Sequence, residues 1–555
     1  MQKIHGHIGG LKPDQLRRIT QLYRRRLPPR RVVTHELARE LTELSRELNR
    51  QIGLLVSRQG EVAGVIVGTH QQIVIPALDS FRAASTRFKG LRLIHTHLNA
   101  EGLTHDDLTD LALLRLDLIC AMEATADGLP GMAHTAHLIP ENPAGEFWQV
   151  LPPARPSELD LDFLAFIQAL EGEFQKQQRT RRVEAADRAL LVRAETDPNG
   201  EPEACLDELR ELAHSCGVEV FDAVLQYRDR MDPRFVIGRG KLADVVIRAL
   251  QIGANLLIFD HELTAAQARS IGDFTELKVI DRTQVILDIF AQRAHSREGK
   301  IQVELAQLKY RLPRLVKMDA ALSRLTGGIG ARGPGEMKLE IDRRRVRERI
   351  HRLEQDLKGI GKARNQRRVR RERTGLPVVS IVGYTNAGKS TLLNALTKSR
   401  VLTEDRLFAT LDPKSSRLRF PRDTEAVITD TVGFIRDLPP DLFAAFRATL
   451  DELKEADCLL HVVDVSNPRF ENQIAAVEKI LAELSMTGKP TLMVLNKADR
   501  VADRDRLAAL SQRYGGVAVS ALNPGTLPGL LEALERLIGR LSPPGVGAVI
   551  ESTGG

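Results

Sequence analysis

A glycine-framed loop between an apolar run and a helical run constrains the fold of this chain most. Residues 378–382 read VVSIV, and the loop that follows at 383–390 reads GYTNAGKS. Apolar residues with helical spacing begin directly after the loop, at Thr391. A strand, a G-x-x-x-x-G-K-S loop and a helix, in this order, form the structure that holds nucleotide phosphates. The sequence therefore predicts a nucleotide site in a parallel α/β sheet.

The residue types in this loop suit phosphate groups. Its glycines allow a tight curl, so that successive backbone N–H groups point at phosphate oxygens. We expect Lys389 to reach the β- and γ-phosphates and Ser390 to ligate Mg²⁺. The residues expected to contact the nucleotide here are Gly383, Tyr384, Thr385, Asn386, Ala387, Gly388, Lys389 and Ser390.

Two further elements follow in the order that a guanine-nucleotide switch requires. We expect Thr410 to ligate Mg²⁺ and sense the γ-phosphate, Asp430 to hold Mg²⁺ through water, and the Gly433 N–H to meet the γ-phosphate. The expected contact residues are Phe408, Ala409, Thr410, Leu411, Asp412, Asp430, Thr431, Val432 and Gly433. Catalytic roles are expected for Lys389, Thr410 and Gly433, and direct magnesium ligation for Ser390 and Thr410.

The last two elements are expected to read the base. The Asp499 carboxylate can accept hydrogen bonds from two adjacent N–H donors that guanine has and adenine lacks. We expect Asn496 to tie its loop to the phosphate loop, Lys497 to lie over the base, and the Ala521 N–H to meet the guanine O6. The residues of these elements are Asn496, Lys497, Ala498, Asp499, Ser520, Ala521 and Leu522. The five elements together predict a domain that binds GTP or GDP with Mg²⁺ and hydrolyses GTP.

One position departs from the switch pattern. Phe434 stands where Ras-like proteins carry the glutamine that orients the attacking water. Phenylalanine cannot make that hydrogen bond. We therefore expect hydrolysis to be slow alone and to rise when a partner completes or orders the site.

The length of 555 residues predicts several domains. We expect a multidomain α/β protein: a P-loop GTPase domain with a mostly parallel sheet and helices on both faces, preceded by an α/β domain with a long helical hairpin and by an N-terminal α/β domain. The predicted segments are 1–150, the linker and connecting helix 151–185, the α/β part 186–296, the basic hairpin 297–374, the GTPase domain 375–540 and a mobile tail 541–555.

The predicted hairpin carries a basic run. Helical stretches at 301–315 and 337–373 flank a glycine-rich loop at 327–335, and from 358 to 373 only Glu372 opposes the basic residues. Earlier residues of the second stretch have interspersed acids, as a solvated helix does. The uncompensated run favours phosphate-backbone binding, and its lack of aromatic residues argues against stacking on single-stranded bases. We expect contact with structured RNA.

The N-terminal segment contains two histidines that could share a metal. In a predicted strand at 91–97, His95 and His97 point to the same face, and Asp107 follows at a helix start. The set resembles the H-x-H…S-x-x-D motif of the JAMM/Mov34 metalloproteases, with Glu61 as an upstream acid. The loop from His97 is one residue shorter than the family pattern, and Leu98 replaces the usual proline. A metallopeptidase and a binding module with hydrogen-bonded core histidines both remain open.

Residues from about 186 to 540 are similar to the HflX GTPases of the TRAFAC class. The resemblance rests on GRGK at 238–241, on GARGPGE at 330–336 with the helix through Arg345, and on the phosphate-loop and switch elements. It implies binding to the large ribosomal subunit and its RNA, which the loop at 327–335 would probe near the peptidyl-transferase centre. It also implies splitting or rescue of stalled ribosomes under stress, with GTP hydrolysis governing release. Some members also accept ATP.

Composition narrows the location and the partners. The 80 Lys and Arg residues exceed the 73 Asp and Glu residues, which suits a polyanionic partner. The four cysteines form no C-x-x-C pair, and no apolar run approaches the roughly 20 residues of a membrane helix. We expect a cytoplasmic monomer without a membrane span.

Two functions other than ribosome binding are also consistent with the sequence. They are a signalling or scaffold GTPase with a protein partner and a GTP-regulated metallopeptidase.

Overall fold

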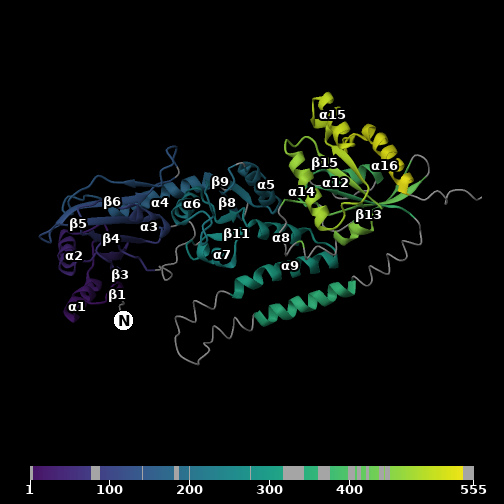
Figure 1. Cartoon of the computed structure of the whole chain (residues 1–555). Coiled ribbons are helices and arrows are strands. Elements are labelled where there is room, and N and C mark those ends of the chain that lie inside the picture. Colours follow the sequence, from purple (N-terminus) through teal and green to yellow (C-terminus); the bar gives the residue numbers. More distant parts are fainter. Residues whose placement is uncertain are drawn as a thin grey trace, which may run out of the picture. The chain divides into compact units, whose positions relative to one another are not determined.

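The computed structural model describes residues 4–76, 88–140, 142–180, 187–198, 200–275, 277–316, 343–360, 376–397, 407–408, 414–420, 424–436, 443 and 450–541. These residues form three sheets with their helices (Figure 1), so the predicted multidomain α/β fold is confirmed. The chain divides into two compact units: 1–202 with 218–259 and 267–279, and 203–217 with 260–266 and 280–555. No helix in the described ranges is long and apolar enough to cross a membrane.

The first unit contains a mixed seven-stranded sheet in the order β1-β3-β2-β4-β5-β6-β7. Its strands are Ile4–Gly6 (β1), Ile52–Ser57 (β2), Val62–Val67 (β3), Leu91–His97 (β4), Leu118–Ala124 (β5), Pro130–Leu138 (β6) and Trp148–Val150 (β7). Its helices are Pro13–Gln21 (α1), Leu22–Arg24 (η1, a 3₁₀ turn), His35–Leu48 (α2), His105–Leu113 (α3) and Phe163–Thr180 (α4). The strand predicted at 91–97 is confirmed.

Alternate residues of these strands enter two cores on opposite faces of the sheet. Ile94 packs with α2 residues such as Leu41, whereas Leu93 packs with Leu111 of α3. Because side chains alternate along a strand, His95 shares the face of Leu93. The α3 side of the sheet is therefore the side on which β4 presents its histidines.

A smaller sheet has four strands in the order β11-β10-β8-β9, and β8 is parallel to both of its neighbours. Its strands are Arg188–Glu195 (β8), Glu219–Tyr227 (β9), Leu256–Phe259 (β10) and Lys278–Asp281 (β11). The helices of this part of the chain are Pro202–Ser215 (α5), Arg239–Ile252 (α6), Ala265–Gly272 (α7) and Arg282–Arg293 (α8). This alternation of strands and helices agrees with the parallel pairing of β8 with β9 and β10.

Two long helical stretches follow in the second unit. Helix α9 spans Arg297–Val316, and residues 343–360 are also helical. The two lie side by side (Figure 1), with Ile301 and Leu305 packed against Leu353 in a shared apolar cluster. The glycine-rich loop 327–335, the basic run 361–373 and the tail 542–555 lie outside the described residues.

The sheet of the second unit has the order β13-β14-β12-β15-β16-β17 and is parallel except for β13. Its strands are Val378–Gly383 (β12), Lys414–Arg419 (β13), Glu425–Asp430 (β14), Cys458–Asp464 (β15), Thr491–Asn496 (β16) and Val517–Ala518 (β17). The helices and 3₁₀ turns are Lys389–Thr397 (α12), Asp451–Glu455 (η2), Phe470–Glu483 (α14), Ala498–Arg500 (η3), Arg504–Tyr514 (α15), Pro524–Thr526 (η4) and Leu527–Leu541 (α16).

Helices cover both faces of this sheet. Leu460 of β15 packs with Leu392 and Leu530, from α12 and α16, while Val463 of the same strand packs with Ile474 of α14. The parallel strands β12, β14, β15 and β16 end at one edge of the sheet, and ligands of such sheets bind at that edge.

Candidate nucleotide-binding site

The loop between β12 and α12 has a backbone that requires glycine at two positions. Gly383 has φ +151°, and a Cβ atom there would lie 2.2 Å from the Val462 carbonyl oxygen. Gly388 has φ +89°, and its Cβ would lie 2.3 Å from Nδ2 of Asn496. Side chains at either position would therefore displace β15 or the Asn496 loop. The structure of this loop therefore requires glycine at both positions.

Lys389, the first residue of α12, is buried beneath this loop. Its ammonium group donates to the Tyr384 carbonyl oxygen at 2.7 Å. Burial lowers the pKa of Lys389 to about 8; the nearby Asp430 carboxylate opposes this shift and Lys497 adds to it. A Cβ at Gly433 would lie 3.0 Å from the Lys389 nitrogen, so the two predicted catalytic residues are neighbours.

Two oxygen-bearing side chains lie together where β12 and β14 end. The Ser390 hydroxyl donates to Oδ2 of Asp430 at 2.6 Å. The other Asp430 oxygen accepts from the Thr431 N–H at 3.1 Å, while the Thr431 hydroxyl is held by the Ile381 carbonyl oxygen. A hydroxyl and a carboxylate are the hard oxygen donors that Mg²⁺ prefers. The pair therefore fits a magnesium ion, with Ser390 available as a direct ligand.

Phe434 joins the loop and the segment that follows Asp430. Its N–H donates to the Gly383 carbonyl oxygen at 3.1 Å, and its carbonyl oxygen accepts from the Thr385 N–H at 2.7 Å. The side chain is only 1% exposed. Phe434 thus has a packing role here, and its ring has no group that could orient a water molecule.

The elements expected to read the base also meet at this edge. Nδ2 of Asn496 donates to the Ala387 carbonyl oxygen at 2.8 Å, and its Oδ1 accepts from the Ala521 N–H at 3.0 Å. Lys497 has φ +59° and pairs with Asp464 at 2.7 Å, while Asp499 is exposed. Asn496 therefore bonds the phosphate loop on one side and the loop of Ala521 on the other.

The remaining predicted site residues are only partly described. Ser520 is buried, with its N–H bonded to the Thr526 hydroxyl, and Leu522 is exposed. Phe408 is buried and has φ +56°. The residues Ala409, Thr410, Leu411 and Asp412 lie outside the described part of the chain.

A polar network that sequence reasoning missed links the phosphate loop to α5 and α8 within the second unit. The Tyr384 hydroxyl donates to Glu208 at 2.5 Å and accepts from the Arg436 N–H at 2.9 Å. Arg282 donates to the Arg436 carbonyl oxygen at 2.9 Å and also pairs with Glu208. Tyr384 occupies a variable position of the loop pattern, so the pattern contains no signal for this role.

A hydrogen bond and a ring contact hold the residues just before Thr410, the predicted switch threonine. The Leu407 N–H donates to the Ser215 hydroxyl at 3.2 Å, at the end of α5. The Phe408 ring meets Phe290 of α8 edge to face, with centroids 4.7 Å apart. The described residues beside the two predicted switch segments, 407–408 and 436, therefore contact α5 and α8.

We predict that Tyr384→Phe lowers the free energy of unfolding of the second unit by about 1–2 kcal/mol, because Glu208 and the Arg436 N–H each lose a buried partner. Calorimetry measures this, on the transition that GDP shifts to higher temperature. The control is Tyr514→Phe, which removes a hydroxyl bonded to Glu471 at 3.0 Å on the surface. It should change stability by less than about 0.5 kcal/mol. Equal effects of the two variants would contradict the network.

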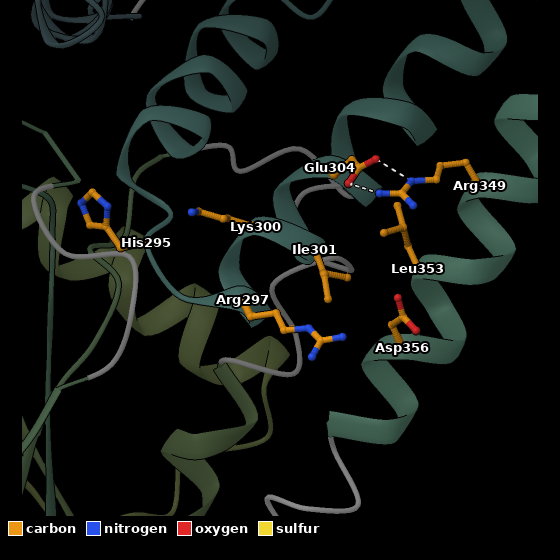
Figure 2. Close-up of a pocket in the computed structure, with 8 residues that line it drawn as sticks. All are labelled: His295, Arg297, Lys300, Ile301, Glu304, Arg349, Leu353 and Asp356. Atoms are coloured by element: carbon orange, nitrogen blue, oxygen red, sulfur yellow. Dashed lines mark hydrogen bonds and ion pairs between the residues drawn. The ribbon is translucent and has the colours of Figure 1, made fainter.

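The pair of helices next to this domain encloses an open pocket, drawn in Figure 2. Its lining residues are His295, Arg297, Lys300, Ile301, Glu304, Arg349, Leu353 and Asp356. Arg349 points across it to Glu304, with a 2.7 Å contact (Figure 2). That arginine helps to hold the two helices together, whereas Arg347 and Arg352 of the same helix are exposed to solvent.

The first unit brings His95, His97 and Asp107 together, although the loop before Asp107 is one residue short. The cap of α3 explains this: the Asp107 N–H donates to the Thr104 hydroxyl at 3.2 Å, while Oδ2 of Asp107 accepts from the Thr104 N–H at 2.8 Å. This capping box fixes the start of α3 against the end of β4.

The prediction that Glu61 belongs to this group is wrong. Glu61 is exposed and pairs with Arg26 at 2.7 Å. Its carbonyl oxygen accepts from Ser57, which lies opposite Leu91, whereas His95 lies opposite Gly53. Four residues along a strand correspond to about 13 Å. Glu61 therefore lies towards the other end of β4.

Three family models match consecutive parts of the chain. The model "GTP-binding GTPase N-terminal" matches residues 203–291, "GTP-binding GTPase Middle Region" matches 293–371, and "50S ribosome-binding GTPase" matches 378–497. The first of these begins in α5, and the last spans the sheet edge from the phosphate loop to the Asn496 element.

Curated relatives cover the same large part of the chain. The GTPase HflX of Caldanaerobacter subterraneus subsp. tengcongensis is 49% identical over 350 residues, which are 63% of this chain and 80% of that protein. The GTPase HflX of Escherichia coli K12 is 43% identical over 364 residues, which are 65% of this chain and 85% of that protein. A solved GTP-binding protein of Sulfolobus solfataricus in complex with GDP is 26% identical, covers 64% of this chain and 100% of its own, and has a TM-score of 0.36.

Proposed function

The chain belongs to the HflX family of GTPases, and from this premise we propose that it binds the large ribosomal subunit and splits or rescues stalled ribosomes. As a member of the family it binds GTP and hydrolyses it to GDP and phosphate. In the proposal it acts in the cytoplasm as a monomer, and hydrolysis governs its release from the ribosome.

We infer the roles of the phosphate-side residues from their places at the sheet edge. The Lys389 ammonium exchanges the Tyr384 carbonyl for β- and γ-phosphate oxygens, and the Gly433 N–H meets the γ-phosphate. Ser390 and Thr410 would ligate Mg²⁺, and Asp430 would hold it through water. Bound there, Mg²⁺ supplies positive charge to the phosphate oxygens as charge develops on them.

The base-side residues provide the selection for guanine. Asp499 accepts from the two N–H donors of the base, and the Ala521 N–H exchanges Oδ1 of Asn496 for the guanine O6. Before the base binds, Asn496 keeps these two elements in register with the phosphate loop, through its contacts to Ala387 and Ala521. Recognition of guanine and binding of phosphate are thereby coupled through one side chain.

Slow hydrolysis without a partner follows from Phe434. Its ring is buried, and its backbone is committed to Gly383 and Thr385. The water that attacks the γ-phosphate must therefore be oriented by another group, which the ribosome supplies or which becomes ordered when the ribosome binds. A large stimulation by the partner is the expected consequence.

The observation that supports ribosome binding most is the charge of the helix at 343–360. Two of its three acidic residues, Glu348 and Glu354, are engaged, by Arg344 at 2.9 Å and by Lys309 at 2.8 Å, and the third is Asp356. Arg347, Arg352 and Lys358 are exposed. Exposed cations on a rigid helix suit the phosphate backbone of structured RNA, and the family model "50S ribosome-binding GTPase" agrees with that partner.

The test is GTP hydrolysis with and without purified large ribosomal subunits. We expect stimulation of tenfold or more, and binding that weakens steeply as salt rises. The triple variant Arg347→Glu, Arg352→Glu, Lys358→Glu should bind the large subunit less tightly. The slope of the logarithm of its binding constant against the logarithm of salt concentration should become shallower by about one per lost phosphate contact. A matched triple changes three exposed cations elsewhere to Glu: Lys479, Arg504 and Arg506.

The outcomes separate the competing functions. Turnover that large subunits do not change would contradict the proposal. Stimulation by a ribosome-free protein fraction that survives nuclease treatment would instead favour a signalling or scaffold partner. Equal loss in both triple variants would assign the effect to net charge and remove the role of the helix.

A pH dependence follows from the pKa of Lys389. Phosphate oxygens beside Lys389 favour its charged form, so its pKa of about 8 rises on binding. Below pH 8 the lysine is already protonated and GDP affinity should be flat. Above pH 8 binding must take up a proton, so affinity should fall by up to about tenfold per pH unit. Titration calorimetry in buffers of different ionisation heat measures this uptake, and no proton uptake at pH 9 would contradict it.

A further inference from the structure

The first unit contains a group of three potential ligand side chains that the GTPase function does not use. Nε2 of His95 lies 2.9 Å from Nε2 of His97 and 3.1 Å from Oδ1 of Asp107. Nε2 of His97 lies 3.4 Å from Oδ2 of Asp107. All three side chains are buried, at 0%, 2% and 7% exposure. In the described part of the chain, no other group of three His, Cys, Asp or Glu residues converges in this way.

These separations are those of ligands around one ion. Two ligands that each lie about 2.1 Å from a zinc ion, at the tetrahedral angle, are about 3.4 Å apart. At the right angle of an octahedral site the same bonds give about 3.0 Å. The two contacts of His95 Nε2, at 2.9 and 3.1 Å, are close to the octahedral value, and the contact of His97 Nε2 with the second oxygen of Asp107, at 3.4 Å, matches the tetrahedral one. The side chains therefore need little movement to hold a divalent ion.

The surroundings orient two of the three ligands. Nδ1 of His97 lies 3.3 Å from the Glu101 carbonyl oxygen, which favours a proton on Nδ1 and a lone pair on Nε2. Asp107 is held by the N–H and the hydroxyl of Thr104, both bonded to Oδ2, at 2.8 and 2.7 Å. Such outer contacts are typical of metal-binding histidines and carboxylates.

Hydrogen bonding alone leaves part of the group unsatisfied when both imidazoles are neutral. With its proton on Nδ1, His97 presents a lone pair to Oδ2 of Asp107, so two acceptors face each other at 3.4 Å. His95 can donate through Nε2, but its buried Nδ1 then remains an acceptor without a hydrogen-bond partner among the described residues. A cation between the three atoms removes the repulsion, because each atom then donates its lone pair to the ion.

We propose that His95, His97 and Asp107 bind one divalent transition-metal ion, zinc or iron(II). Two imidazoles and one carboxylate suit both ions and leave further positions for water or another ligand. The site joins the end of β4 to the start of α3 across the loop at 98–104. Glu61 is at the other end of the strand, so the ion is assigned a binding role and peptidase chemistry is not part of the proposal.

The first test is the metal content of the full-length protein after dialysis against metal-free buffer. We expect about one ion per chain, and elemental analysis distinguishes zinc from iron. After chelation, added Co²⁺ should give the absorption of a site with nitrogen and oxygen ligands. Chelation should also lower the unfolding temperature of the transition that GDP does not shift, by roughly 5 °C or more.

Matched variants assign the ion to these residues. His97→Ala and the nearly isosteric Asp107→Asn should each lose it. His134→Ala should retain it; that histidine lies on β6 of the same sheet and contacts Glu123 at 2.9 Å. GDP binding should persist in all three, which separates a failure here from a failure of the GTPase assignment.

Two results would overturn the proposal. One is a full-length protein that contains no transition metal and takes up neither Zn²⁺ nor Co²⁺ at micromolar concentration. The other is retention of the ion in both His97→Ala and Asp107→Asn. If His97→Ala fails to fold, Asp107→Asn and the Co²⁺ titration of the unaltered chain still decide the question.

Discussion

The Lys389→Ala variant is expected to lose GTP hydrolysis by at least about 100-fold, the scale seen when one preorganised donor to a reacting group is removed. The ammonium group lies next to Gly433 and below the loop. Its loss removes positive charge from the point where charge develops on the γ-phosphate. Single-turnover hydrolysis measures the chemical step apart from product release.

The control for this variant is Lys479→Ala, an exposed lysine on α14. It should hydrolyse GTP at the unaltered rate, both alone and with large ribosomal subunits. If Lys389→Ala kept more than a tenth of the activity, another group would have to supply the charge. A Lys389→Ala protein that retained ribosome stimulation in full would contradict the assignment of the phosphate site itself.

The second large effect is expected from Asp499→Asn, which should change the base preference from guanine to xanthine. The carboxylate accepts from two N–H groups of guanine, and an amide presents an N–H donor to one of them instead. Loss of charge-assisted hydrogen bonds should weaken GDP binding by about 100-fold, or about 2.7 kcal/mol. Xanthine carries a carbonyl oxygen where guanine has its amino group, and this oxygen can accept from the amide N–H of the variant. Xanthosine diphosphate (XDP) should therefore bind the variant more tightly than GDP does.

Asp503→Asn is the matched control for Asp499→Asn. Asp503 is a nearby exposed aspartate that caps α15, through Oδ1 and the Arg506 N–H at 2.9 Å. Its replacement should leave the ratio of GDP to XDP affinity unchanged. An Asp499→Asn protein that still prefers GDP would show that other groups select the base. Because Asp499 is exposed, the substitution should leave folding intact.

The GTPase fold could be predicted from sequence because its elements are local. The β12 strand, the glycine loop and α12 are contiguous in the sequence. Only glycine fits sterically at positions 383 and 388, so these two residues identify the loop in the sequence. Side-chain alternation likewise placed His95 and His97 on one face of β4. Each of these inferences depends on a few neighbouring residues and on the period of one element.

What the sequence did not reveal depends on contacts between distant residues. Tyr384 meets Glu208, which lies 176 positions away, and no spacing rule connects them. Glu61 was misplaced because its distance from the histidines depends on the registers of β2 with β3 and β4. The position of Asp107 beside the histidines likewise depends on a contact, because the Thr104 cap sets where α3 begins.

The backbone pairing of Phe434 has a mechanical consequence for how the nucleotide is sensed. Phe434 is clamped to Gly383 and Thr385, and two residues later Arg436 is clamped to the hydroxyl of Tyr384. A displacement of Gly433 by the γ-phosphate would therefore move residues 434–436 relative to the phosphate loop. Tyr384 and Arg436 contact Glu208 and Arg282, so loss of the γ-phosphate would change the positions of α5 and α8.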